Sequence, residues 1–222
     1  MKRFLMQLSR LLFPPKCVLC GKLLRNAEND LCHPCRTDTT HYPSKNPKLP
    51  YLAKWIALWY YEGSVRKSLL LYKFRGRRHY AKTYGRLLAM KLLSEETGFD
   101  VLTWVPISTM RKWKRGYDQV ALIAHALGDE LGIAPVSTLK KVRNNRPQSR
   151  LKGAPQRRAN VMGAYRCVHP EAIAGKRVLL LDDIITTGAT AGECARVLLT
   201  AGAAEVVCAA VAAASHHSKI SR

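Results

Sequence analysis

Apolar and polar positions alternate along the chain, from residue 55 onward, between short β-rich runs and longer runs with helical spacing. We expect strands at 55–61, 101–105, 177–182 and 206–211, and helices at 65–72, 80–93, 117–131 and 190–201. Such alternation is typical of an α/β fold with a largely parallel sheet. The last strand, helix and strand of this series form one βαβ unit.

The helix expected at 117–131 has the clearest amphipathic pattern. Its apolar positions recur at helical spacing, and Gly132 directly after them is a typical helix stop. These positions are Val120, Ile123, Ala124, Leu127 and Leu131. We therefore expect one face of this helix to pack on the sheet.

The first residues predict a short amphipathic helix, with Phe4, Leu8, Leu11 and Leu12 on one face. Packing on the rest of the chain is favoured over a position on a membrane surface. Polar residues interrupt the apolar stretch and no cleavage site follows, so we expect no export signal. No apolar run approaches the roughly 18 residues of a membrane span. These features favour a cytoplasmic protein, in which seven cysteines would not form a disulfide framework.

Four of the cysteines form two identical C-x-x-C pairs separated by eleven residues, Cys17 with Cys20 and Cys32 with Cys35. Two such turns can complete the tetrahedral thiolate shell that zinc prefers. Two unrelated redox pairs are the alternative, but a redox motif needs only one pair. A shell closed by four thiolates leaves no position for water, so the zinc is expected to be structural.

A proline-rich stretch of low apolar content follows the cysteines and indicates a linker. We expect an N-terminal helix and four-cysteine zinc module at 1–42, a linker at 43–54 and the α/β domain at 55–222.

The composition adds a strong positive charge to this plan. The chain has 222 residues with 37 Lys and Arg against 15 Asp and Glu, a formal net charge of +22. With 47% hydrophobic residues it is expected to fold and to carry this charge on its surface. Nucleic acid, phosphorylated metabolites and anionic membranes are the candidate partners.

The best candidate site follows the buried run at 178–181. Asp182 and Asp183 come first, then Thr186, Thr187, Gly188, Ala189 and Thr190 at the start of a helix. Hydroxyls, a glycine and free helix-start amides suit a phosphate, and paired carboxylates suit the vicinal hydroxyls of a ribose. The pattern therefore predicts a ribose phosphate site. The alternative is a helix capped by Thr187 or Thr190, with two acids in an ordinary turn.

At these residues the sequence resembles the type I phosphoribosyltransferases, whose motif for the sugar diphosphate matches Val178 to Thr190. The cysteine module and other segments extend the resemblance to the ComF family, which joins a zinc ribbon to a phosphoribosyltransferase-like domain. Some members of that family are linked to DNA uptake in natural transformation. The further segments are Val105 to Ile107, Arg115 to Gln119, Gln148, Leu151, Arg157, Asn160 and Gly163.

The resemblance implies a type I phosphoribosyltransferase-like parallel sheet flanked by helices, behind a small zinc ribbon. It also implies that Asp182, Asp183 and Arg111 are catalytic, with Ser108 and Arg111 beside the leaving diphosphate. Magnesium and basic side chains would stabilise the charge that develops there. The chain departs from the family at Asp118, where Asn is more usual.

Two long segments contain no acidic residue. The first lies between Glu130 and Glu171. Prolines and a glycine in its middle predict a mobile flap over the sugar diphosphate, and a solvated basic face is the alternative. Its basic residues are Lys140, Lys141, Arg143, Arg146, Arg150, Lys152, Arg157, Arg158 and Arg166.

The second acid-free segment, at 65–94, interleaves basic residues with aromatic ones and can bind single strands. We expect Lys73, Arg75, Arg77 and Arg78 to contact phosphates, with Tyr72, Phe74 and Tyr80 stacking on bases. Tyr84 also belongs to a helix core face, so a structural role for these aromatics stays open.

Three functions fit the sequence. The favoured one is a DNA-uptake or DNA-processing protein that binds single-stranded DNA and phosphoribosyl diphosphate, with competence-machinery proteins as further partners. The second is an active magnesium-dependent phosphoribosyltransferase acting on a nitrogen nucleophile in nucleotide metabolism. The third is a scaffold whose charge only aids solubility or partner docking.

Overall fold

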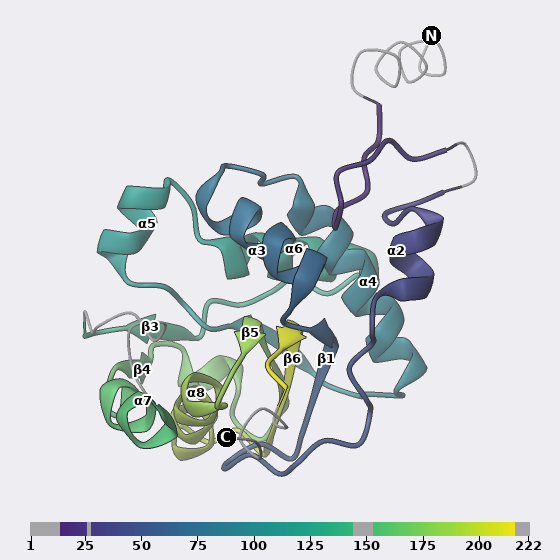
Figure 1. The fold of residues 1–222 in the computed structure, drawn as a ribbon. Coiled ribbons are helices and arrows are strands. Elements are labelled where there is room, and N and C mark those ends of the chain that lie inside the picture. The colour runs from purple at the N-terminus through teal and green to yellow at the C-terminus, as the bar shows by residue number, and fades with distance from the viewer. Residues whose placement is uncertain (1–13, 26–27, 144–152, 216–222) are drawn as a thin grey trace, which may run out of the picture.

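A computed structural model describes residues 14–25, 28–143 and 153–215. Its centre is a parallel sheet of four strands in the order β1-β6-β5-β2. These strands are β1 (Lys54–Tyr60), β2 (Val101–Trp104), β5 (Arg177–Ile185) and β6 (Glu205–Ala213). The α/β architecture with a parallel sheet flanked by helices is confirmed (Figure 1).

Helices cover both faces of the sheet. One layer contains α3 (Gly63–Phe74), α4 (Tyr80–Ser94) and α6 (Gln119–Leu131), and α8 (Ala189–Thr200) lies on the other face (Figure 1). Residues alternate between the two faces along β5, so that Leu179 and Leu181 pack into one core and Val178 and Leu180 into the other. All four are fully buried, as expected for a central parallel strand.

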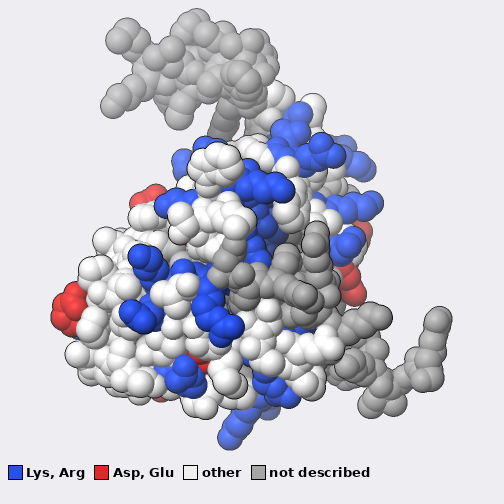
Figure 2. Space-filling model, turned by 90° about the vertical axis from the view of Figure 1, so that its left-hand side faces the viewer, with Lys and Arg blue, Asp and Glu red and all other residues white. Residues whose placement is uncertain are grey.

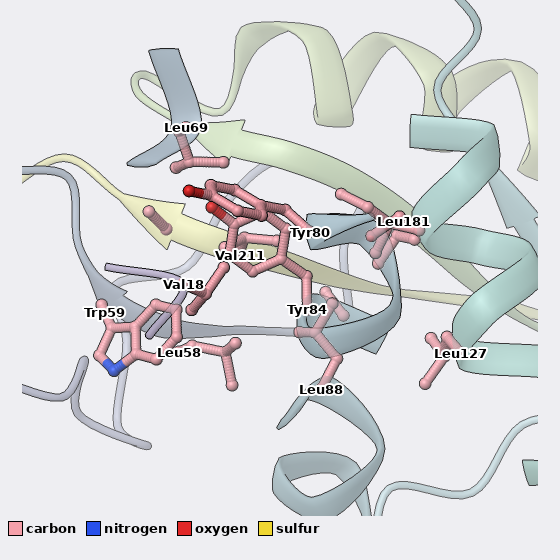
Figure 3. Close-up of a cluster of buried hydrophobic side chains, with 14 of the residues drawn as sticks. Val18, Leu58, Trp59, Leu69, Tyr80, Tyr84, Leu88, Leu127, Leu181 and Val211 are labelled. Carbon is pink, nitrogen blue, oxygen red and sulfur yellow. The ribbon is translucent and has the colours of Figure 1, made fainter. Parts of the chain in front are cut away.

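The zinc module is packed against the helical layer. Val18, Leu19 and Leu31 are buried in the same core as Leu58 and Tyr84 (Figure 3). The Ser68 hydroxyl donates to the Val18 carbonyl, and the Arg86 guanidinium lies 2.5 Å from the Asp30 carboxylate. The short helix α2 (His33–Asp38) follows the second cysteine pair directly.

The segment that joins the module to the sheet is also held in place. The Tyr42 ring lies 5.3 Å from the Trp55 ring and 4.6 Å from the Tyr60 ring, measured between centroids. The indole N–H of Trp55 donates to the Pro47 carbonyl at 2.8 Å. The segment is therefore packed against β1.

A small antiparallel pair, β3 (Leu139–Lys141) with β4 (Tyr165–Cys167), stands beside the main sheet. The preceding segment attaches it to β2, where the Val136 amide donates to the Leu102 carbonyl at 2.8 Å. Helix α7 (Gly153–Val161) and the 3₁₀ turn Pro170–Ala172 complete this region.

The structure corrects part of the predicted flap, because the end of the acid-free segment forms α7 instead of a loop. Pro155 lies in the first turn, where a missing N–H costs no hydrogen bond. Gln148 and Leu151, with Arg146, Arg150 and Lys152, lie outside the described residues, as does the amphipathic segment with Phe4, Leu8, Leu11 and Leu12. In the part of the chain that is described, no helix has the length and apolar character to cross a membrane.

Candidate functional site

The two acids lie inside β5, which continues to Ile185, whereas the sequence predicted that the strand would end at Asp182. Asp182 pairs in register with Ala210 of β6. Only 8% of Asp182 and 6% of Asp183 is exposed. The sheet therefore holds both carboxylates rigidly at its carboxyl end, the edge at which ligands of open α/β sheets bind.

Asp183 has a protein partner on each oxygen. The Lys73 ammonium lies 2.9 Å from Oδ1, and the Gln119 side-chain amide donates to Oδ2 at 3.1 Å. Lys73 is the penultimate residue of α3 and Gln119 is the first residue of α6. Two helices of the covering layer thus converge on one carboxylate.

Gln119 retains an unused acceptor. Its Oε1 is buried and has no hydrogen-bond partner among the described residues, although the side-chain nitrogen is paired with Asp183. The hydroxyl of Ser108, 5% exposed, is likewise buried without a partner. Buried polar groups are normally satisfied, so the unpaired Gln119 oxygen beside Asp183 marks a place for a ligand or water.

Asp182 has a different environment. Its Oδ1 accepts from the Asp183 amide at 2.8 Å. Burial and then the neighbouring Asp183 charge raise the pKa of Asp182 to about 8, against weaker opposing effects of Lys73 and Lys141. The surroundings of Asp182 therefore favour its protonated form, which can donate a hydrogen bond, while Asp183 forms the ion pair with Lys73.

A small hollow opens after the strand. Its walls are the residues of the predicted phosphate cradle with their neighbours: Asp182, Ile184, Ile185, Thr186, Thr187, Gly188, Ala189, Thr190 and Ala191. The N-cap of α8 is Gly188, with φ of 71°, which has no side chain to cap the helix. The N-cap is therefore neither Thr187 nor Thr190, and the first-turn amides form a helix start that suits an anion.

Gly188 meets a second constraint from the joining segment. A Cβ added at Gly188 would lie 2.6 Å from the Leu49 side chain, and one added at Gly192 would lie 3.2 Å from the Pro50 carbonyl. Both the left-handed backbone and this contact favour glycine at position 188. The segment after the zinc module thus supports the cradle from outside.

The β3–β4 pair supplies a positive wall. The Lys141 ammonium donates to the Tyr165 hydroxyl at 3.1 Å, and burial followed by the Arg111 charge lowers the pKa of Lys141 to about 8. Burial and the Arg115 charge lower the pKa of Arg111. The charge of Asp182 acts to raise the pKa of both Lys141 and Tyr165. The sequence indicated Lys141 only as one of the basic residues of the first acid-free segment, and it did not indicate Tyr165 as a site residue.

Ser108 and Arg111 lie on the expected loop, which forms the short helix α5 (Thr109–Arg115). Asp118 fixes the end of this loop. Its Oδ1 accepts from the Val120 and Ala121 amides at 3.0 and 3.2 Å, and its Oδ2 accepts from the Ile107 amide at 3.3 Å. An Asn side chain lacks the second acceptor, so the carboxylate supplies a tether that Asn at this position cannot reproduce.

The predicted stacking of Tyr72 and Tyr80 on bases is wrong. Tyr72 is fully buried and 8% of Tyr80 is exposed, because both rings pack with Tyr84 in the core (Figure 3). The Tyr72 hydroxyl donates to the Gln119 carbonyl at 2.5 Å. Among these aromatics Phe74 is the exposed one, at 62%.

The four basic residues of the same stretch divide into two groups. The Lys73 side chain is 15% exposed and points inward to Asp183, so it is not a free surface cation. Arg75, Arg77 and Arg78 are exposed beyond it. Figure 2 shows that Lys and Arg spread over the face that bears α5, β3 and α7, whereas Asp and Glu lie mostly at its margins.

The paired cysteines form a metal site. Their sulfur atoms all lie within 4.8 Å of one another, and 3.5 Å separates the sulfurs of Cys20 and Cys32. Zn–S bonds of about 2.3 Å in a tetrahedron place sulfurs about 3.8 Å apart, so the cluster fits zinc. The site is made by Cys17, Cys20, Cys32 and Cys35.

Comparisons with known proteins match two families to separate parts of the chain. Residues 8–47 match the double zinc ribbon domain, and residues 122–221 match the phosphoribosyl transferase domain. The chain is 31% identical over 201 residues to the "DNA utilization protein YhgH" of Salmonella typhimurium, covering 86% of each chain. It is 26% identical over 215 residues to "Competence protein F" of Haemophilus influenzae, covering 86% of this chain and 93% of that one.

Among solved structures, the one titled as the allosteric regulatory enzyme of purine biosynthesis has 24% sequence identity and a TM-score of 0.41. That likeness covers 64% of this chain and 29% of the other chain.

The fold and the matches define a protein with a zinc ribbon followed by a phosphoribosyltransferase-like domain. The chain belongs to the ComF family, and its four-cysteine site is that of a structural zinc.

Proposed function

We propose that the chain is a DNA-uptake or DNA-processing protein whose pocket binds phosphoribosyl diphosphate or a related ribose phosphate. The observation that carries the ligand assignment is that the buried Asp182, next to Asp183 in β5, shares one hollow with the glycine-capped start of α8. A ribose 5′-phosphate has its hydroxyls and its phosphate at opposite ends, which matches this order of groups.

In this proposal the residues have separate roles. The amides and hydroxyls from Thr186 to Thr190 receive the 5′-phosphate, and Asp182 with Asp183 receives the ribose hydroxyls. Each carboxylate oxygen has two lone pairs, so Asp183 can accept from a hydroxyl while keeping Lys73 and Gln119. The unpaired Gln119 Oε1 is a further acceptor for a sugar hydroxyl.

Magnesium fits this site only together with the ligand. Burial raises the pKa of Asp182, and the Lys73 ammonium already neutralises Asp183, so the chain alone offers no pair of free carboxylate charges for the ion. Bound with the sugar diphosphate, magnesium would neutralise the diphosphate charge. Arg111 and Ser108 of the neighbouring loop would face the same group.

Calorimetric titration with phosphoribosyl diphosphate and magnesium chloride tests the ligand assignment. We expect Asp182→Asn combined with Asp183→Asn to weaken binding by at least tenfold, because the ion pair is lost and an NH2 donor replaces one oxygen of each carboxyl group. Asp129→Asn on the exposed surface of α6 is the matched control. Equal affinity of the double variant and the wild type would refute the assignment.

The DNA role is supported by the charge of +22 and by the exposed arginines at 75, 77 and 78. It also agrees with the names of the relatives, which refer to DNA utilization and competence. Single strands are the proposed substrate, competence-machinery proteins are further partners, and a cytoplasmic location follows from this role. A filter-binding assay with single-stranded and duplex oligonucleotides at several salt concentrations tests it.

A second candidate function is an active phosphoribosyltransferase that uses a nitrogen nucleophile. The observation in its favour is the positive wall of Lys141 and Arg111 near Asp182, where the departing diphosphate would need cations. Incubation with labelled phosphoribosyl diphosphate, with and without single-stranded DNA, separates the two functions. Release of diphosphate favours the transferase, and binding without release favours the ligand-binding role.

A further inference from the structure

None of the seven residues of helix α5 is buried. Its side chains include Met110, 61% exposed, and Trp113, 86% exposed. The other three tryptophans differ, since Trp55 and Trp59 are at most 3% exposed and Trp104 is half-buried. The Trp113 indole is thus exposed on a helix that has no buried residue. Such exposure of a large apolar side chain indicates a binding role.

The neighbourhood of this indole is strongly positive. Arg111, Lys112, Lys114 and Arg115 lie on α5 itself, and the segment from Val101 to Tyr117 contains no acidic residue. The Arg115 guanidinium lies 4.9 Å from the centre of the exposed Phe74 ring, which joins α5 to the end of α3. The Arg78 guanidinium lies 4.6 Å from the centre of the Tyr117 ring, so both guanidinium groups lie over aromatic rings.

This surface borders the pocket. Lys73, directly before Phe74, reaches Asp183, and Arg111 of α5 is close enough to Lys141 to lower its pKa. Figure 2 shows this side of the molecule, on which basic side chains surround residues of other kinds. Exposed aromatic faces among cations are the arrangement that binds single strands, since bases stack on the rings while cations follow the phosphates.

We propose that α5 and the end of α3 form a landing surface for single-stranded nucleic acid, in which a base stacks on the Trp113 indole. This surface is defined by Phe74, Arg75, Arg77, Arg78, Lys112, Trp113, Lys114 and Arg115. The proposal rests on the DNA-handling role given above, and it adds α5 with Trp113 to the basic stretch that the sequence pattern identified. An anionic membrane is less suitable, because membrane affinity grows with apolar area and Met110, Trp113 and Phe74 offer little.

The test compares a 20-nucleotide oligo(dT) with an abasic strand of the same length, using fluorescence anisotropy. We expect Trp113→Ala to weaken oligo(dT) binding about tenfold and to leave abasic-strand binding unchanged, because only stacking is lost. Trp113→Phe should restore most of the affinity. Met110→Ala, an exposed apolar change on the same helix, is the matched control and should bind like the wild type.

A second measurement uses the protein's own fluorescence. Oligo(dT) should quench the tryptophan emission of the wild type, and this quenching should disappear in Trp113→Phe because the remaining tryptophans are shielded. Equal oligo(dT) affinity of Trp113→Ala and wild type would overturn the proposal, as would an equal loss on both strands.

Two outcomes separate this surface from the DNA role itself. If Arg75→Ala, Arg77→Ala and Arg78→Ala together weaken oligo(dT) binding while Trp113→Ala does not, the landing surface is rejected and the DNA role stands. If the wild type does not bind oligo(dT) at low salt, the DNA role fails. Weaker binding of Trp113→Ala to phosphatidylglycerol vesicles with unchanged oligo(dT) binding would assign the indole to membranes and overturn the proposal.

Discussion

At the scale of single residues, the two adjacent acids of the site have unequal chemistry. Asp183 forms an ion pair with Lys73 and accepts a hydrogen bond from Gln119. Asp182 accepts from a backbone amide, and burial raises its pKa. The sequence indicates the acids because a buried run precedes them and a threonine-glycine loop follows. It cannot indicate Lys73 or Gln119 as their partners, since these contacts depend on how α3 and α6 pack on the sheet.

The raised pKa of Asp182 predicts a pH-dependent stability. Between pH 4 and pH 8 an unfolded chain loses this proton while the folded chain keeps it, so the free energy of unfolding falls as the pH rises. Asp182→Asn removes this ionisation. The free energy of unfolding of the variant, relative to that of the wild type, should therefore rise by about 1–3 kcal/mol from pH 5 to pH 9. Urea unfolding at both pH values measures this. A constant difference would show that Asp182 titrates normally.

Lys141 predicts a pH-dependent affinity for the ligand. Its ammonium loses its proton as the pH rises through about 8, so affinity for phosphoribosyl diphosphate should fall in that range. Lys141→Arg keeps the positive charge, because guanidinium does not deprotonate there, and should flatten the profile. Titration calorimetry between pH 6.5 and 9.5 compares the two proteins. Any pH dependence of the affinity left in the variant would come from the ionisation of Asp182. Identical pH profiles of the two proteins would show that Lys141 is not the group that causes the fall in affinity.

At the scale of elements, the strands and helices of the main sheet are largely predictable from the sequence because each is long and periodic. Gln119–Leu131 and Ala189–Thr200 lie within one residue or two of their predicted bounds at most ends. The β3–β4 pair and α5 were missed. Strands of three residues and a helix without a buried face carry no hydrophobic period, so only tertiary contacts define them.

The turn before α8 predicts a strong effect of one methyl group. Gly188→Ala must adopt φ of 71° and also displace Leu49, so it should destabilise the fold and weaken ligand binding. Gly132→Ala is the matched control, with φ of 68° and open space around the added methyl. The left-handed backbone costs each variant about 1–2 kcal/mol, and Gly188→Ala should lose more. Thermal unfolding measures both losses, and equal losses would mean that the Leu49 contact is unimportant.

At the scale of the whole molecule, the zinc module and the α/β domain share a core. The paired cysteines predict the metal site from spacing alone, since four thiolates need only two tight turns. The docking of Val18 and Leu19 beside Leu58 is not visible in that spacing. Loss of the metal should therefore affect the large domain as well as the ribbon.

Zinc removal tests this shared core. We expect one zinc per chain, and we expect Cys32→Ser with Cys35→Ser to lose it and to lower the unfolding temperature of the whole protein in a single transition. Cys167→Ser, outside the cluster, should keep both the zinc and the transition. Metal analysis with calorimetry measures the two quantities. Zinc retained in the double variant, or an α/β domain that melts at the wild-type temperature, would contradict the shared core.

The charge of the whole molecule predicts how nucleic acid binding depends on salt. A surface that binds through phosphates releases condensed cations, so affinity should fall steeply with salt and depend little on base sequence. Replacing Arg75, Arg77 and Arg78 by Ala should reduce the slope on single strands by about 2, at about 0.7 per lost contact. Replacing Lys45, Lys48 and Lys176, which are exposed outside the basic stretch, removes the same charge and should leave the slope nearly unchanged. An equal fall in slope for both triple variants would show that net charge alone, and no defined surface, governs binding.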